Sequence, residues 1–320
     1  MGTKDIETAI FFDDDRRYAD LLNGYIFDGK QVIMEKQLYS QDTRETGKSQ
    51  KDSWGVQKRK KIQRFRDGVK RVAFGTSFTI IALEHQDKIH RGMPVRVMVE
   101  DALSYDRQMK KLQKQNREKG VLNKKDYISS LTDTDVLTPV VTIVIYYGEE
   151  PWNNSKDIYD ILAHKDLPEE IKTFINHYQI HVLDVRRFTN EECFQTDVRE
   201  VFGFIRRSLD KEAVKQYLKE REEQFTNIDE DAYDLIAAMT DTKQLQMVKD
   251  KYRSEEGGIN MCKGLLDWVE ESKIEGKSAG ELTILKLITA MQLDGRTSDI
   301  TRLSSEPEFL EGMKKHYHIQ

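Results

Sequence analysis

The spacing of apolar residues predicts helices and strands in turn along the first part of the chain. Residues 14–27 keep one apolar face at helical spacing, and Asp14 or Asp15 is placed to cap the first turn. Residues 31–38 contain adjacent β-branched side chains and predict a strand. The polar stretch 40–53 predicts a loop.

Two β-rich runs on either side of Gly75-Thr76 predict a hairpin. Glycine at the first central position of a two-residue turn suits type II′ geometry. In this hairpin Phe74 pairs with Ser77, and each further step pairs the next residue on either side. The predicted register therefore places Asp67 directly opposite Glu84.

Asp67, Glu84 and Gln86 then share one face of the hairpin, because side chains alternate along a strand. Cross-strand neighbours lie roughly 4.5–5.5 Å apart at Cβ, so the two carboxylates repel unless something offsets their charge. A divalent cation is one solution. The alternative is that Asp67 only begins a strand on the solvent side and Glu84 pairs with an arginine. His85 alternates to the opposite face, which favours a packed or exposed histidine over a ligand.

The middle of the chain predicts a long helix and a buried strand. Residues 93–116 hold a helical apolar spacing. Residues 138–147 are continuously apolar and β-branched, which predicts a central strand rather than an edge strand. Helices near 156–164 and 168–178 follow, and then a strand near 180–184.

From about residue 190 onward the pattern is almost entirely helical, with a break at Gly257-Gly258 before a helix over 261–274. We therefore divide the chain into an α/β domain over residues 1–188 and a helical region over 189–320. The helical region is expected to serve oligomerisation or the placement of a substrate.

Composition excludes several classes of protein. Charged residues make up 33% and hydrophobic residues 38% of the 320 positions, so we expect a soluble protein. No run of about 18 apolar residues exists, and the N-terminus lacks the pattern of a secretory signal. Cys193 and Cys262 form no CxxC pair, which favours a reduced, cytoplasmic setting. Nucleotide-binding glycine loops and the GxSxG motif of serine hydrolases are also missing from the sequence.

Basic residues gather on both sides of the predicted carboxylates, although the net charge is −5. Solvated helix and loop faces would explain either cluster alone. Their position around the carboxylates favours a substrate with a phosphate backbone. The second cluster lies between Arg107 and Lys125. The residues of the first that we expect to contact DNA are Lys58, Arg59, Lys60, Lys61, Arg64 and Arg66.

Several short motifs occur in a familiar order. Asp67, then Glu84-His85-Gln86, then Met93-Pro94-Val95-Arg96 at the start of a helix resembles the Rpn family of recombination-promoting nucleases, also described as transposases. That family belongs to the PD-(D/E)XK nuclease superfamily. Further resemblances to the same family lie at Ala19–Asn23, Phe27–Gly29, Tyr146–Trp152 and Asn260–Cys262.

The resemblance implies an α/β (α+β) fold with a restriction-endonuclease-like αβββαβ core and a mixed central sheet. It implies that Asp67 and Glu84 are ligands for Mg²⁺ (or Mn²⁺). Gln86 stands where the superfamily usually has lysine. Lysine can stabilise developing negative charge, whereas glutamine can only orient a water or lend a carbonyl oxygen. The superfamily's acidic residue on the first core helix is best matched by Asp20, with Asp14 as the alternative.

The implied activity is metal-dependent cleavage of double-stranded DNA, with a homodimer supplying one active site per strand. Arg96 is expected to contact a phosphate or to orient Glu84, unless it only pairs with Glu100 at i+4. The alternative function is a catalytically weak or inactive DNA-binding relic of a mobile-element protein, and the glutamine at position 86 is the feature that supports this alternative. RNA is a further possible substrate.

Overall fold

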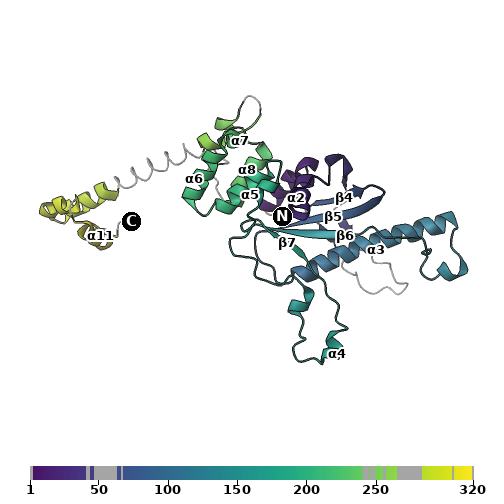
Figure 1. Ribbon diagram of the computed structural model, residues 1–320. Helices are drawn as coiled ribbons and strands as arrows, with labels where there is room; N and C mark the ends of the chain where they lie inside the picture. The colour runs from purple at the N-terminus through teal and green to yellow at the C-terminus, as the bar shows by residue number, and fades with distance from the viewer. Residues whose placement is uncertain are drawn as a thin grey trace, which may run out of the picture.

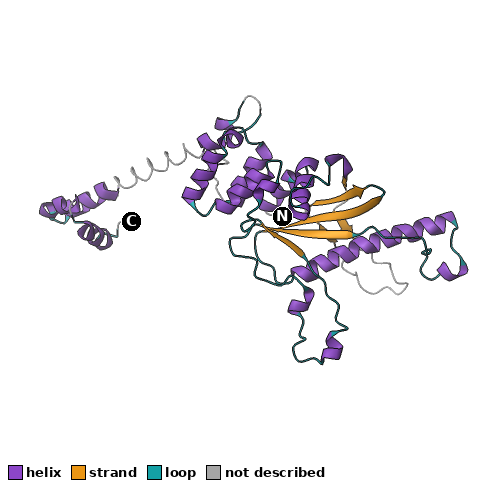
Figure 2. Ribbon diagram, in the orientation of Figure 1, coloured by secondary structure: helices purple, strands orange, loops and turns teal. Residues whose placement is uncertain are grey.

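A five-stranded sheet with helices on both faces forms the centre of the molecule (Figures 1 and 2). The structure is a computed structural model. It describes residues 3–40, 44–46, 63–65, 68–240, 245, 249–254, 257–264, 283–304 and 306–318. The predicted mixed α/β class is confirmed.

The sheet has the strand order β1-β4-β5-β6-β7. Strand β1 pairs antiparallel with β4, and β4 pairs antiparallel with β5. Strand β6 pairs parallel with β5, and β7 pairs parallel with β6. Because β6 lies between β5 and β7, the predicted central strand is confirmed. The strands of the sheet are β1 (Leu38–Ser40), β4 (Gly68–Phe74), β5 (Ser77–Gln86), β6 (Val140–Tyr146) and β7 (His181–Asp184).

The hairpin of β4 and β5 has the predicted register. Phe74 pairs with Ser77, and the pairing continues as far as Gly68 opposite Leu83. Gly75 has φ of 61°, a left-handed value that disfavours side chains with a Cβ. The turn therefore explains why glycine stands there and fixes which residues of β4 and β5 are neighbours.

Helix α2 (Asp15–Phe27) begins where the sequence predicts, because the Asp14 side chain accepts hydrogen bonds from the backbone N–H groups of Arg16 and Arg17. It ends at Asp28, which has a left-handed backbone. A preceding helix, α1 (Thr3–Phe11), was not predicted.

The strand predicted over 31–38 is wrong except at its end. The Asn23 side chain accepts hydrogen bonds from the backbone N–H groups of Val32 (3.0 Å) and Ile33 (2.9 Å), and donates to the Ile33 carbonyl (2.7 Å). These backbone groups are therefore satisfied by helix α2 rather than by a neighbouring strand. A 3₁₀ turn, η1 (Glu35–Gln37), follows before β1 begins.

Replacing Asn23 with alanine should lower the free energy of unfolding by about 2–3 kcal/mol, since buried backbone groups would lose their partners. Chemical denaturation measures the change. Gln216→Ala is the control, because that exposed amide donates to the exposed Glu220 carboxylate and its loss should cost under about 0.5 kcal/mol. Equal losses in the two variants would contradict this account.

The loop predicted over 40–53 is wrong at its described positions. Ser40 ends β1, and Arg44–Thr46 forms β2, which pairs antiparallel with β3 (Gln63–Phe65) as a separate two-stranded sheet. Three residues of each strand pair with the other strand, so their backbone groups are hydrogen-bonded. The polar composition of the segment did not indicate this pairing.

Helix α3 (Met93–Lys119) covers the opposite face of the sheet from α2 and is longer than predicted. Met93 and Val97 are buried against Val144 and Tyr146 of β6. Asp101 and Tyr105 also accept hydrogen bonds from Thr142 and Val140 of β6, and the C-terminal part of the helix projects beyond the sheet (Figure 1). It ends at Gly120, and the chain then returns to β6 through η2 (Lys124–Asp126).

The two helices predicted between β6 and β7 are shorter in the structure. Only η3 (Ile158–Ile161) and α4 (Glu169–Lys172) are helical. The N–H of Ile158 donates to the Tyr178 carbonyl, and the N–H of Ile180 donates to the Lys156 carbonyl. This backbone pairs with the returning chain, so it cannot continue a helix.

The described residues after 190 are mainly helical, as predicted. Phe202 lies 6.4 Å from Phe12 and 6.3 Å from Tyr147, measured between ring centroids. One apolar core therefore lies between one face of the sheet and the helices α1, α2, α5 and α8. The boundary at residue 188 stays a prediction. The elements of this part are η4 (Glu191–Cys193), α5 (Val198–Arg207), α6 (Lys211–Glu220), α7 (Glu222–Thr226) and α8 (Glu230–Met239).

The end of the chain carries η5 (Lys249–Tyr252), η6 (Thr297–Ser304) and α11 (Pro307–His316). Residues 261–264 and 283–293 are also helical, and the predicted break at Gly257-Gly258 is present. Leu287, Met291 and Leu303 form a small apolar cluster of their own. Within the ranges that the structure describes, every helix is too short or too polar to cross a membrane.

Candidate active site

Glu84 is a buried carboxylate near the end of β5. Its side chain is 1% exposed, and in the parallel register it lies beside Val144 of β6. Val144 packs under Met93 and Val97, so Glu84 points to the side of the sheet that α3 covers. Burial of an ionised carboxylate is costly unless cations or hydrogen bonds compensate. The surroundings of Glu84 therefore determine what this position can do.

Arg96, one turn into α3, supplies that compensation. Its Nη2 forms an ion pair with Glu84 Oε1, and its Nε lies 3.3 Å from Glu100 Oε1. The Glu100 side chain is also 1% exposed, whereas that of Arg96 is 32% exposed. One guanidinium thus lies between two buried carboxylates. Arg96 thus contacts Glu84 and also makes the i+4 pair with Glu100, whereas its contact with a phosphate stays a prediction.

Gln86 completes the group at the end of β5. Its Nε2 donates to Glu84 Oε1 (3.2 Å) and to the backbone carbonyl of His85 (2.7 Å). Because an amide is planar, its oxygen faces away from these two acceptors. Gln86 can therefore orient Glu84 through its amide nitrogen, and its side-chain carbonyl oxygen can contact a water or a cation.

His85 points to the other face of the sheet, as predicted. Its ring stacks on Phe12 and Tyr147 at centroid distances of 5.5 and 5.9 Å, and its Nδ1 lies 3.2 Å from the Tyr147 hydroxyl. Burial lowers the pKa of His85 to about 3, so the ring is neutral at pH 7. It is a packed core residue on the side away from Glu84.

A family model described as "Putative transposase, YhgA-like" matches residues 75–236, which is half of the chain. The chain belongs to the YhgA-like transposase family. This is the Rpn family that the sequence motifs indicated, so that prediction is confirmed. Neither the comparison with curated proteins nor the comparison with solved structures gave a match.

The YhgA-like match contains Glu84, Gln86 and Arg96, whereas Asp20 and Asp67 precede it. Asp67 lies outside the described residues. The confirmed hairpin register stops one pair short of it, with Gly68 opposite Leu83. A position for Asp67 opposite Glu84 therefore stays a prediction.

The Asp20 side chain links helix α2 to the segment before α5. Its carboxylate accepts hydrogen bonds from the backbone N–H of Gln195 (2.8 Å) and from the N–H (2.7 Å) and hydroxyl (2.6 Å) of Thr196. These bonds join α2 to the turn before α5. Its alternative, Asp14, caps α2. A catalytic role for Asp20 stays a prediction.

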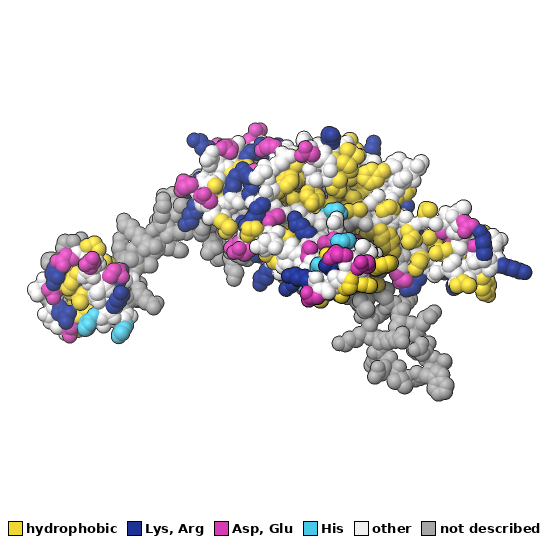
Figure 3. Space-filling view, turned by 60° about the horizontal axis from the view of Figure 1, so that its bottom comes forward, with side chains coloured by type: hydrophobic (Ala, Val, Ile, Leu, Met, Phe, Trp, Pro, Cys, Tyr) yellow, Lys and Arg dark blue, Asp and Glu magenta, His cyan; other side chains and the backbone are white. Residues whose placement is uncertain are grey.

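Most residues of the first basic cluster fall outside the described ranges, namely Lys58, Arg59, Lys60, Lys61 and Arg66. Arg64 belongs to β3, and of the predicted DNA contacts only Arg96 has a described side chain. Residues of the second cluster lie on the projecting end of α3. Lys110 pairs there with Asp106 at 2.5 Å, and Lys125 pairs with Asp133. Figure 3 shows basic, acidic and apolar side chains together at this end.

The donor atoms fit a hard divalent cation. Glu84 and Glu100 offer carboxylate oxygens and Gln86 an amide oxygen, the ligand types that Mg²⁺ and Mn²⁺ prefer. In the described ranges, groups of three or more Asp, Glu, His or Cys residues that could hold a metal ion are absent. A complete ligand set therefore depends on Asp67, on Gln86 or on both.

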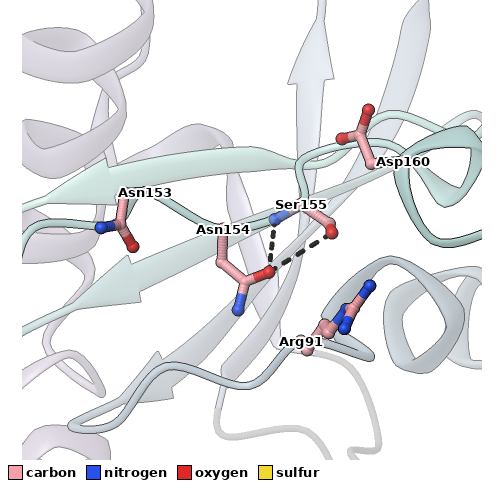
Figure 4. A pocket seen from close by; sticks show the side chains of 5 residues that line it. All are labelled: Arg91, Asn153, Asn154, Ser155 and Asp160. Atoms are coloured by element: carbon pink, nitrogen blue, oxygen red, sulfur yellow. Dashed lines mark hydrogen bonds between the residues drawn. The ribbon is translucent and has the colours of Figure 1, made fainter.

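Two cavities were not predicted, and neither is lined by Glu84, Gln86 or Arg96. One, of about 460 Å³, lies past the ends of β5 and β6 and is lined by Asp87, Lys88, Tyr146 and Arg186 among others. The other, of about 560 Å³, is lined by Arg91, Asn153, Asn154, Ser155 and Asp160 (Figure 4). Its lining comes from the turn before α3, the loop after Trp152 and η3, and no recognisable motif in these segments predicts a cavity.

Proposed function

We propose that this protein is a metal-dependent DNA endonuclease that hydrolyses phosphodiester bonds. The observation that carries the proposal is the buried Glu84, which shares one side of the sheet with Gln86 and Arg96. An ionised group kept in such a position costs stability, and groups of this kind gather at functional sites. Membership of a transposase family agrees with chemistry on DNA.

The order of elements supports a restriction-endonuclease-like core. Along the chain, α2, β1, β4, β5, α3 and β6 follow in the α-β-β-β-α-β order expected for the superfamily. We propose that this set is the catalytic core. The strand order, with a parallel β6 beside β5, agrees with the mixed sheet that such a core requires.

In the proposed reaction, Asp67 and Glu84 hold the cation and Gln86 orients the attacking water through its carbonyl oxygen. Bound Mg²⁺ supplies Lewis-acid stabilisation of the phosphate and lowers the pKa of that water. Arg96 adds positive charge at the partly exposed edge of the site, where a phosphate oxygen would lie. Burial under α3 limits the water around Glu84 and strengthens each of these interactions.

Double-stranded DNA is the proposed substrate, held mainly through its backbone. The basic residues from Lys58 to Arg66 and the cations at the projecting end of α3 lie on either side of the site in the sequence. Cleavage of both strands requires two active sites, so we propose a homodimer. The helical region after residue 188 would serve its assembly or the placement of DNA.

We expect supercoiled plasmid to be cleaved in the presence of Mg²⁺ or Mn²⁺ and to remain intact with a chelator. Glu84→Ala and Asp67→Ala should each lower the rate on the order of 10³-fold, because each removes a carboxylate from the cation. Gel analysis of time courses measures the rates. Glu169→Ala, an exposed change on α4, is the control and should keep the full rate.

A second candidate function is DNA binding without cleavage. Glutamine at position 86 in place of the superfamily's lysine, together with the ion pair between Arg96 and Glu84, favours it. Folded wild-type protein that binds plasmid in a salt-dependent way but never cuts it would replace the first proposal by this one. Cleavage of single-stranded RNA but not of DNA would instead change the substrate class.

A further inference from the structure

Arg96 occupies the place where a cation is needed at this site. Two carboxylates, on Glu84 and Glu100, are each 1% exposed, and the Arg96 guanidinium contacts one oxygen of each. Two buried negative charges close to each other repel strongly unless a positive charge lies between them. Arg96 therefore offsets part of the negative charge of the two carboxylates.

We infer that Arg96 is a built-in counter-ion, which a divalent cation displaces from Glu84 while Glu100 keeps hold of the guanidinium. The inference rests on the proposed function, because it takes Glu84 as a metal ligand. It adds that this arginine competes with the metal ion for the carboxylate. Glu100 is then a positioning residue, which acts through Arg96.

The contacts of Arg96 make such an exchange possible. Glu84 is held by the terminal Nη2, whereas Glu100 is held by Nε, closer to the backbone. Arg96 and Glu100 are also one turn apart on the same helix, so the guanidinium can move away from Glu84 and remain beside Glu100. The side chain is 32% exposed, which gives the released Nη2 atom access to the surface.

Displacement would couple metal binding to DNA binding. A guanidinium that pairs with Glu84 has its charge already satisfied, whereas one released from Glu84 can form charge-assisted hydrogen bonds with a phosphate. Each ligand would therefore strengthen the binding of the other, because both favour the same position of Arg96. The metal-free protein would bind DNA less tightly as a result.

The test is calorimetric titration of the full chain with Mn²⁺ alone, without DNA. Arg96→Met removes the competing cation and offers no oxygen donor, so Mn²⁺ should bind about tenfold more tightly than to wild type, the size expected for one charge-assisted hydrogen bond. Arg91→Met is the matched control. It removes the same charge from the exposed turn before α3, so its Mn²⁺ affinity should match that of wild type.

Unchanged or weaker Mn²⁺ binding by Arg96→Met would overturn the inference, and so would the absence of Mn²⁺ binding by every variant. If Arg96→Met does not fold, Arg96→Lys replaces it. A lysine cannot contact both carboxylates with one planar group, so Mn²⁺ should again bind more tightly. Tighter Mn²⁺ binding by the variant together with a wild type that never cuts DNA would refute the nuclease and leave the inference standing.

Discussion

Replacing Arg17 with methionine should lower the free energy of unfolding by about 3–5 kcal/mol, the cost of removing one partner from a buried ion pair. Arg17 is 5% exposed, and its Nε and Nη2 donate to the two carboxylate oxygens of Asp197 at 2.9 and 2.8 Å. Asp229, at 2.8 Å, and Asp231, at 3.3 Å, share the same guanidinium. One side chain of α2 thereby fixes the starts of α5 and α8.

The loss of stability in Arg17→Met should depend on pH, because methionine leaves three carboxylates without their common cation. Burial already raises the pKa of Asp197, against the opposing effect of Arg17. Without Arg17 that pKa rises further above the unfolded value. A carboxyl with a raised folded pKa is stabilised by protonation, so the deficit should shrink as the pH falls from 8 towards 5.

Urea denaturation at both pH values measures these changes. Arg16→Met is the control, because Arg16 is 68% exposed and pairs with Asp14 at the surface. Its cost should stay within about 0.5 kcal/mol at either pH. If Arg17→Met lowered the free energy of unfolding no more than Arg16→Met does, the three acidic residues would not need Arg17 as their counter-ion.

The parts of the fold that the sequence predicted are those set by short-range rules. The turn at Gly75 fixes the register of β4 and β5, because a left-handed glycine in a two-residue turn leaves few alternatives. The Asp14 cap fixes the start of α2 in the same local way. Glu84 and Gln86 share a face through strand alternation alone. These features require no knowledge of distant contacts.

The features that were missed depend on contacts that periodicity does not encode. The Asn23 side chain forms hydrogen bonds with the backbone of Val32 and Ile33, so these residues do not pair with a strand of the sheet. The role of Glu100 depends on which face of α3 meets the sheet. Helical spacing places Arg96 and Glu100 on one face, but only packing against β6 turns that face towards Glu84.

Glu84→Gln should separate a metal ligand from a structural ion pair, since the substitution keeps the size of the side chain and removes its charge. We expect cleavage to fall on the order of 10³-fold, because an amide is a much weaker ligand than a carboxylate. Stability should change by less than about 1 kcal/mol. Arg96 keeps Glu100 as a partner and is 32% exposed, so no buried charge is left uncompensated.

Glu191→Gln is the control, because it removes the charge of a buried carboxylate that we expect to serve stability and not cleavage. Glu191 is 4% exposed and pairs with Arg206 and Arg207 at 2.8 and 2.7 Å, among helices that lie away from Glu84 in the sequence. Its loss should lower stability by about 1–3 kcal/mol and leave the cleavage rate of the folded protein unchanged. A metal-binding carboxylate is needed for cleavage and costs stability when no cation is bound. If Glu84→Gln instead lowered the stability and kept the cleavage rate, Glu84 would therefore be a structural partner of Arg96.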